Sequence, residues 1–127
     1  MDNLARAQAI YDAVNRHDLV AFRALFADEI DDRDHARGVT MPTAAILVDR
    51  LRSQFEALPD LRMEDVRLRA AGDAVVAQFT TTGTLAGSSA TMRVPTCEII
   101  RFGDDGLVVG TDIYYDRQTM TEQLGAR

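Results

Sequence analysis

The stretch ATMRVPTCEIIRFGDDGLVVGTDIYY, residues 90–115, predicts an antiparallel β-hairpin in this 127-residue chain. Residues 90–102 and 107–115 alternate between apolar and polar side chains, which is the period of a strand with one buried face. The segment Gly103-Asp104-Asp105-Gly106 joins the two runs with residues typical of a tight turn. We therefore expect two long neighbouring strands.

One carboxyl breaks the alternation of this hairpin. The even positions of residues 90–102 are mostly apolar, yet Glu98 stands among them. A direct four-residue turn would pair Glu98 with Thr111 and Thr96 with Ile113, and would place Tyr115 on the same face. Burial raises the pKa of a carboxyl toward the range useful in acid–base catalysis. We predict that Glu98 faces an apolar cavity as a catalytic group; the alternative is a structural pair with an arginine.

The rest of the chain divides into helices followed by strands. Helical periodicity covers residues 4–14, 19–26 and 47–58, with Asp18 as an N-cap for the second helix and a helix-start signal at Thr40–Pro42 for the third. Alternation returns at 66–70 and 74–84, separated by a turn at 71–73, and residues 116–124 form a short helix closed by Gly125. The acidic segment 28–39 has no sustained period and is predicted to be a loop or short strand.

This order predicts an α+β fold in one domain, residues 1–127. Three helices would pack on one face of a curved sheet of four antiparallel strands, leaving a cavity between the two layers. A chain of this length buries one continuous core but not two.

Composition argues against several classes of partner. The chain carries 14 basic and 20 acidic residues, for a net charge of −6, and all 14 basic residues are arginines scattered among acidic neighbours. Such a surface repels phosphate backbones and anionic lipids. We expect neither a nucleic-acid nor a membrane partner.

Cysteine and histidine content also limits the chemistry. Cys97 stands alone, so no disulfide forms within the chain, and His17 and His35 offer no zinc-ligand spacing beside it. No apolar run approaches the roughly 18 residues of a membrane span, and no signal-peptide pattern opens the chain. We expect a cytoplasmic protein without metal or organic cofactor.

Other candidates are less distinctive. The run containing Asp31, Asp32, Asp34 and His35 has the composition of a solvated loop, although any of these side chains could act in catalysis. Tyr11 lies on the apolar face of the first helix, as a core residue or a ligand contact. The aromatic side chains of Phe55 and Phe79 are further candidates for the cavity wall.

Several short motifs occur together in a characteristic order. They are NRHDL at 15–19, LFAD at 25–28, LPDLR at 58–62, AGD at 71–73, TGT at 82–84, YYD at 114–116 and QLG at 123–125. In this order the chain resembles the NTF2-like superfamily, and in particular the SnoaL-like polyketide cyclases and the ketosteroid isomerases. The resemblance covers nearly the whole chain and implies a cone-shaped α+β barrel, a small-molecule substrate and a homodimer formed through the outer sheet face.

The resemblance also implies site residues. It places the isomerases' general base on Asp34 and a cavity acid, or the cyclases' catalytic histidine, on Glu98. The isomerases' oxyanion tyrosine falls on Ile10, one residue before Tyr11, and the cyclases' second acid falls on Ile113. The superfamily's epoxide hydrolases need an arginine where this chain has Thr96, so hydrolysis of an epoxide is disfavoured.

The predicted function is a cofactor-independent cyclase or isomerase acting on a largely apolar, oxygen-bearing molecule of polyketide type. Glu98 and Asp34 would transfer protons, and the substrate would contact the side chains His35, Tyr11, Tyr115, Thr111, Ile113, Phe55 and Phe79. Two alternatives stay open: a non-catalytic binding or assembly module on the same fold, and a cyclase that works by shape alone.

Overall fold

The computed structural model describes residues 2–125. Its helices are α1 (Asn3–Asn15), α2 (Leu19–Arg23), α3 (Ala44–Ala57) and α4 (Arg117–Leu124). Its strands are β1 (Phe26–Asp34), β2 (Val39–Thr43), β3 (Arg62–Ala71), β4 (Ala74–Thr84), β5 (Thr91–Phe102) and β6 (Val108–Tyr115).

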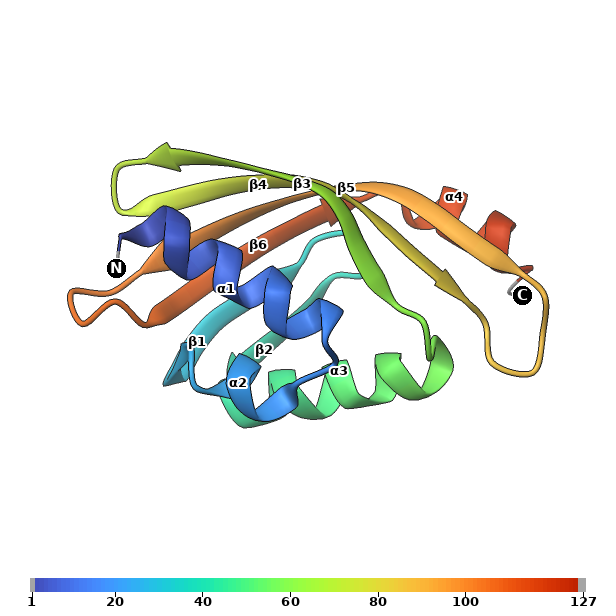
Figure 1. Cartoon of the computed structure of the whole chain (residues 1–127), viewed down its shortest axis with the longest axis horizontal. Helices are drawn as coiled ribbons and strands as arrows, with labels where there is room; N and C mark the ends of the chain where they lie inside the picture. Colours follow the sequence, from blue (N-terminus) through green and yellow to red (C-terminus); the bar gives the residue numbers. More distant parts are fainter. Residues whose placement is uncertain (1, 126–127) are drawn as a thin grey trace.

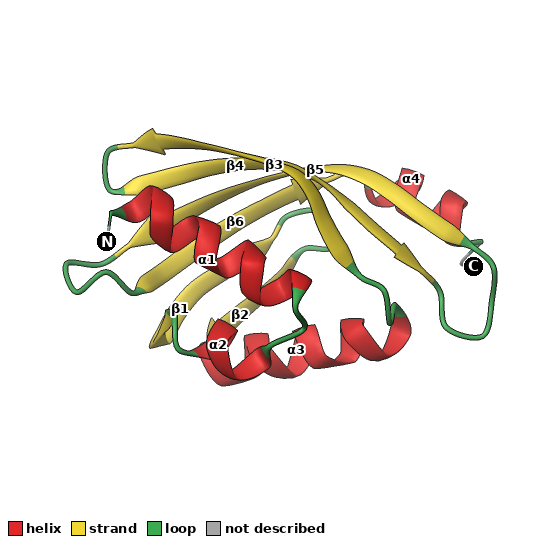
Figure 2. Ribbon diagram, viewed as in Figure 1, coloured by secondary structure: helices red, strands yellow, loops and turns green. Residues whose placement is uncertain are grey.

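The six strands form one curved sheet in the order β2-β1-β6-β5-β4-β3. All neighbours are antiparallel except β1 and β6, which run parallel. The sheet curves over α1, and α2 and α3 lie on the same, concave side of the sheet (Figures 1 and 2). The short helix α4 packs against β5 at the far end of the sheet (Figure 1). This arrangement confirms the predicted α+β cone with three N-terminal helices and a short C-terminal one.

The helices begin where the sequence supplies a capping side chain. The carboxylate of Asp18 accepts from the backbone N–H of Ala21 at the start of α2, as predicted. In α3 the cap is the hydroxyl of Thr43, which accepts from the N–H of Ile46. The predicted helix start at Thr40–Pro42 was therefore early, because these residues pair with β1 as strand β2.

The prediction of four strands, with a loop or short strand at 28–39, was wrong in number. Residues 26–34 form the nine-residue strand β1, which is paired on both sides, with β2 and with β6. Inward and outward positions do alternate in this segment, because Ile30, Asp32 and Asp34 point inward and are buried. Since two of these inward residues are charged, the alternation does not appear as a pattern of apolar and polar residues. Two neighbouring strands supply the backbone hydrogen bonds that the local sequence does not signal.

The predicted hairpin exists, but its register differs by two residues. Glu98 lies opposite Ile113, and Ile100 opposite Thr111, with an irregularity between Arg101 and Phe102. The N–H of Gly103 bonds the carbonyl of Leu107, which makes the connection tighter than a plain four-residue loop. A shift of two preserves the face of each side chain, so the inward set is unchanged.

The core lies between α1 and the sheet. Its largest fully buried side chains are Tyr11, Val14, Val75, Val94, Ile100 and Val108. None of the helices within residues 2–125 has the length and apolarity needed to cross a membrane.

Candidate functional site

Two adjoining chambers lie between the helices and the concave face of the sheet. The inner chamber has a volume of about 100 Å³ and the outer one about 350 Å³. Both are lined by Asp34, Arg50, Gln54, Met63 and Ile113, which form the boundary between them. The outer volume lies in the range of small-molecule sites, and the inner one holds only a fragment the size of a small ring.

The inner chamber is apolar apart from a few groups that face one another. Its wall includes Ile10, Val14, Phe22, Phe26 and Ile100, and its polar side chains include Tyr11, Asp32, Glu98 and Thr111. α1 supplies Tyr11, β1 supplies Asp32, β5 supplies Glu98 and β6 supplies Thr111. Four elements, of which only β5 and β6 are consecutive in the chain, thus bring their polar groups to one small space.

Glu98 is held by a tyrosine and not by an arginine. The hydroxyl of Tyr11 donates a 2.6 Å hydrogen bond to Oε1 of Glu98. No residue within 2–125 bonds Oε2, and no fully buried side-chain nitrogen or oxygen in that range lacks a partner, so Oε2 retains access to the chamber. The residue is half-buried by its exposed area, and this remaining surface faces the chamber.

This environment changes the proton affinity of Glu98. Burial raises the pKa of its carboxyl to about 7, against the opposing effect of the Tyr11 hydrogen bond and with support from the nearby charge of Asp32. Burial and the negative charge of Glu98 also raise the pKa of Tyr11 well above its usual value, so the phenol stays a donor. A carboxyl that titrates near neutral pH can both give and take a proton.

Asp32 is a second acid in the inner chamber. The hydroxyl of Thr111 donates a hydrogen bond to its Oδ1, and Asp32 is 5% exposed. Burial raises the pKa of Asp32; the Thr111 hydrogen bond and the charge of Arg50 oppose this effect, and the charge of Asp34 adds to it. Asp32 and Glu98 are therefore two desolvated carboxyl groups of the same chamber, and the charge of Asp32 helps to raise the pKa of Glu98.

Sheet register separates Asp34 from Glu98. Asp34, Ile113 and Glu98 occupy one row across β1, β6 and β5. Two strand spacings separate the ends of this row by about 10 Å, with the apolar side chain of Ile113 between them. Asp34 therefore does not bond Glu98 directly.

Replacement of Tyr11 by phenylalanine is expected to raise the pKa of Glu98 above about 7. The hydrogen bond stabilises the ionised carboxylate, so its removal favours the protonated form. Carbon-13 NMR titration of the Glu98 carboxyl would measure the shift. The phenylalanine ring keeps the packing on Phe79, whose centroid lies 4.9 Å away, and an unchanged or lower pKa would contradict the assignment.

Asp34 lies at the boundary, bound from several sides. Its Oδ2 accepts from the hydroxyl of Tyr115 at 2.9 Å and from Nη2 of Arg50 at 3.5 Å, and its Oδ1 accepts from the backbone N–H of Arg37 at 3.0 Å. The side chain of Arg37 bonds Tyr115 in turn, through Nε at 2.8 Å. Asp34 is thus 5% exposed and forms an ion pair, a different setting from that of Asp32.

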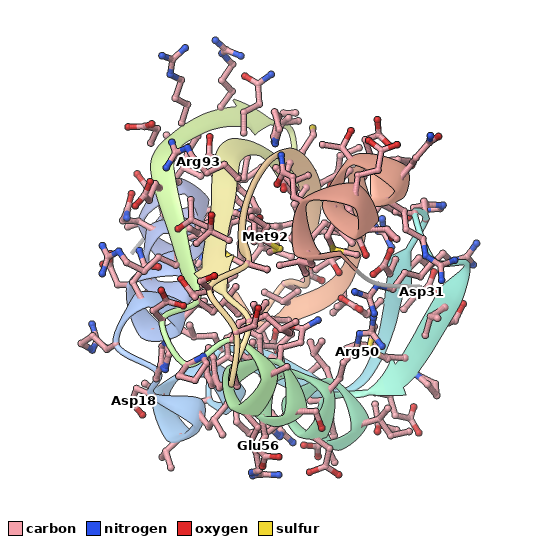
Figure 3. All side chains as sticks on the ribbon, turned by 90° about the vertical axis from the view of Figure 1, so that its right-hand side faces the viewer. Asp18, Asp31, Arg50, Glu56, Met92 and Arg93 are labelled. Carbon is pink, nitrogen blue, oxygen red and sulfur yellow. The ribbon has the colours of Figure 1, made fainter. Side chains whose placement is uncertain are left out.

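The outer chamber is closed on one side by α4. Met120 and Leu124 of this helix line it, together with Leu58, Met92 and Val94. The side-chain amide of Gln123 bonds the backbone N–H and C=O of Arg93, which fixes α4 against β5. In Figure 3, which looks along the sheet from this end, Met92 lies near the middle of the molecule and Arg50 between α3 and the β1–β2 pair.

Three of the predicted contact residues lie outside both chamber walls. His35 follows the inward-facing Asp34, so it points to the outer surface, where it bonds Asp112 at 2.7 Å and stacks on Tyr114. Phe79 fills the space beneath α1 against Tyr11, and Phe55 stacks on His17 at a centroid distance of 3.9 Å. The predicted residues Tyr11, Thr111, Ile113 and Tyr115 do line a chamber, as do Glu98 and Asp34.

Two residues of the site were not singled out from the sequence. Asp32 belongs to a run with the composition of a solvated loop, although the spacing Ile30-Asp32-Asp34 has the period of a strand with an inward face. Arg50 lies on α3 and no local pattern marks it. Within residues 2–125, no cluster of three His, Cys, Asp or Glu side chains has an arrangement that would hold a metal ion.

Comparisons with known proteins agree with this architecture. The model of a family described as the SnoaL-like domain matches residues 7–111. A comparison with proteins of curated function finds no significant match.

Solved structures with the same fold cover nearly the whole chain. A candidate polyketide cyclase from Xanthomonas campestris has a TM-score of 0.87 at 22% identity, over 96% of each chain. IdmH, a candidate polyketide cyclase from Streptomyces antibioticus, has a TM-score of 0.84 at 20% identity, over 98% of this chain and 99% of its own. A Catenulispora acidiphila protein of ketosteroid isomerase-like fold, solved with trimethylamine, has a TM-score of 0.86 at 20% identity, over 96% and 93%. At these identities the likeness establishes the fold.

Proposed function

The chain belongs to the SnoaL-like domain family, and from that premise we propose that it is a cofactor-independent cyclase or isomerase. Its substrate would be a largely apolar, oxygen-bearing molecule of polyketide type. The observation that carries this proposal is the Glu98 carboxyl, which has a pKa of about 7, an accessible oxygen and a tyrosine donor in an apolar chamber.

In the proposed mechanism the substrate places a carbonyl group in the inner chamber. The protonated Glu98, oriented by Tyr11, donates a hydrogen bond and then its proton to the carbonyl oxygen. The carboxylate of Asp32 removes a proton from the neighbouring carbon, and the electron pair of that C–H bond forms the enol double bond. We assign this role to Asp32 and not to Asp34, because the oxygens of Asp34 are already bound by Tyr115, Arg37 and Arg50.

The enol has two fates, which separate the two reaction types. In an isomerisation Asp32 returns its proton to a different carbon, and the enol oxygen gives its proton back to Glu98. In a cyclisation the enol carbon attacks a second carbonyl of the same molecule; Asp32 protonates the new alkoxide while the enol oxygen returns its proton to Glu98. Each sequence restores both carboxyl groups to their starting states.

Hydrogen exchange in D₂O tests the shared first step without knowledge of the natural substrate. We expect the protein to accelerate deuterium incorporation next to the carbonyl of 2-tetralone, followed by proton NMR. Replacement of Glu98 by glutamine should lower the accelerated rate by about a hundredfold, within the usual range for a general acid. Exchange at the same rate in both proteins would reject acid–base catalysis by Glu98.

The same measurement separates the alternatives. A binding module would give no acceleration, and a cyclase that works by shape alone would tolerate the glutamine variant. An arginine-paired Glu98, as in a structural ion pair, would have a lowered pKa, whereas the raised value supports catalysis. Homodimerisation through the outer sheet face, which includes Cys97, Asp112 and the 44% exposed Tyr114, stays a prediction.

A further inference from the structure

Arg50 occupies an unusual position between the two chambers. Its side chain lines both of them and is 24% exposed. Its one hydrogen bond with residues 2–125 is the 3.5 Å contact from Nη2 to Asp34. A guanidinium has five N–H donors, so four of them are left for another partner.

The guanidinium groups at this boundary outnumber the carboxylates that bind them. Arg37 and Arg50 both face Asp34, which brings two guanidinium groups to one carboxylate. Tyr115 and Met120 are the other side-chain partners of Arg37, and neither carries a negative charge. Asp32 is the next acid toward the inner chamber: the charge of Arg50 acts on it, but the hydrogen bond to its Oδ1 comes from Thr111 and not from Arg50.

The apolar surroundings of Arg50 make a charged side chain energetically unfavourable there. The outer chamber is walled mainly by aliphatic and thioether side chains, among them Leu58, Leu61, Met92 and Val94. The guanidinium is only partly exposed to water, and a single 3.5 Å bond to Asp34 compensates poorly for the hydration that it has lost. The chain as a whole carries a net charge of −6, so general attraction of anions does not explain this arginine.

We propose that Arg50 binds the carboxylate of the substrate, which is therefore an amphipathic acid. Its fork of donors matches the two oxygens of a carboxylate, a geometry that lysine cannot reproduce. The apolar body of the molecule would lie in the outer chamber and its reacting carbonyl in the inner one. The carbonyl would then lie within about 10 Å of the carboxylate, the separation between the Asp34 and Glu98 strands.

This inference rests on the proposed function for the role of the inner chamber, but binding tests it separately from turnover. The probes are 2-naphthoate and 2-naphthamide, which have the same shape and differ in charge, with naphthalene fluorescence as the readout. We expect the protein to prefer the acid by at least about tenfold, the effect of a hydrogen bond to a charged group. Arg50→Gln should abolish that preference and leave amide binding unchanged.

Arg52→Gln is the matched control, because Arg52 also lies on α3 but bonds Asp49 on the surface. It should keep the full preference for the acid. If Arg50→Gln does not fold, Arg50→Lys retains the charge beside Asp34 and should still reduce the preference, because the fork is lost.

Equal binding of acid and amide, a preference that survives in Arg50→Gln, or no binding of either probe would overturn the inference. None of these results would alter the expected exchange of 2-tetralone, which depends on Glu98. Conversely, failure of that exchange would reject the proposed catalysis and leave the carboxylate preference standing.

Discussion

Glutamine in place of Glu98 is expected to stabilise the protein above neutral pH by up to about 3 kcal/mol. The carboxyl has a pKa of about 7 in the folded chain against a usual 4.5, and each unit of difference corresponds to about 1.4 kcal/mol. Glutamine has nearly the same shape and its carbonyl oxygen can still accept the hydrogen bond from Tyr11. The value is an upper limit, because the Glu98 carboxyl keeps access to the chamber.

The sign follows from the direction of the shift. Between the unfolded pKa and the folded one, the folded state holds a proton that the unfolded state has released, so stability of the natural protein falls as pH rises through this window. Above about pH 7 the loss is complete. The glutamine side chain does not titrate, so the advantage of the variant is small below pH 4.5 and grows toward pH 7.

Urea unfolding of both proteins at about pH 4 and about pH 8 would measure this difference. Glu122→Gln is a suitable control, since it removes one carboxyl from the exposed face of α4 and leaves the chambers untouched. A Glu98 variant less stable than the natural protein at the higher pH would mean that the ionised carboxylate is stabilised by its surroundings. That result would favour a structural role for Glu98.

A stabilising substitution at the centre of the site has a simple physical meaning. The fold contains a desolvated carboxyl, although a glutamine at the same place would cost less folding free energy. Proteins keep such destabilising groups where their activity needs them. In the proposed mechanism that cost is what brings the carboxyl to a pKa useful for giving and taking a proton near neutral pH. The exchange experiment and the unfolding experiment therefore measure two effects of the same desolvation.

Prediction from sequence succeeded where neighbouring residues determine the structure. Strand β4 occupies residues 74–84 as expected, and the inward face of the hairpin is the predicted one, because the period of two is local information. The segment of strand β1 was predicted only as a loop or short strand because its charges resemble a loop, and the pairing with β2 and β6 makes it a nine-residue strand. One residue of the register shift arises at the turn, where Phe102 lies opposite Val108, and the other at the irregularity between Arg101 and Phe102.

The site was predictable only where a local sequence pattern marks a residue. Glu98 can be recognised in the sequence because it interrupts an apolar face. Its partner Tyr11 is 87 residues away, and the orientation of the tyrosine depends on how α1 docks on the sheet. The family resemblance placed the oxyanion donor on Ile10, whereas the hydroxyl that reaches Glu98 belongs to the next residue. Arg50 meets Asp34 only because α3 packs on β1, which no local pattern specifies.

Substitutions of Asp32 and Asp34 by asparagine are expected to change stability in opposite directions. The two carboxyl groups lie two residues apart on the same face of β1, and both are 5% exposed. Asp32 lacks a hydrogen-bonded cation among residues 2–125, and burial raises its pKa. In Asp32→Asn the amide oxygen can still accept from Thr111, so stability at neutral pH should stay equal or rise.

Asp34→Asn should instead destabilise the protein by about 2 kcal/mol. Its Oδ2 accepts from Tyr115 and Arg50, and its Oδ1 accepts from the N–H of Arg37, so an asparagine amide of either orientation faces a donor. The substitution also leaves Arg50 without its carboxylate, although the partly exposed guanidinium can turn toward solvent, which keeps the loss below that of a fully buried pair.

Urea unfolding of the two variants at neutral pH gives the stability change, and exchange of 2-tetralone gives the chemical effect of each. We expect Asp32→Asn to be folded and at least as stable as the natural protein but slow in exchange, because the proposed base is lost. Equal destabilisation of both variants would mean that Asp32 also has a structural role. Rapid exchange in a stable Asp32→Asn protein, together with slow exchange in Asp34→Asn, would return the role of base to Asp34.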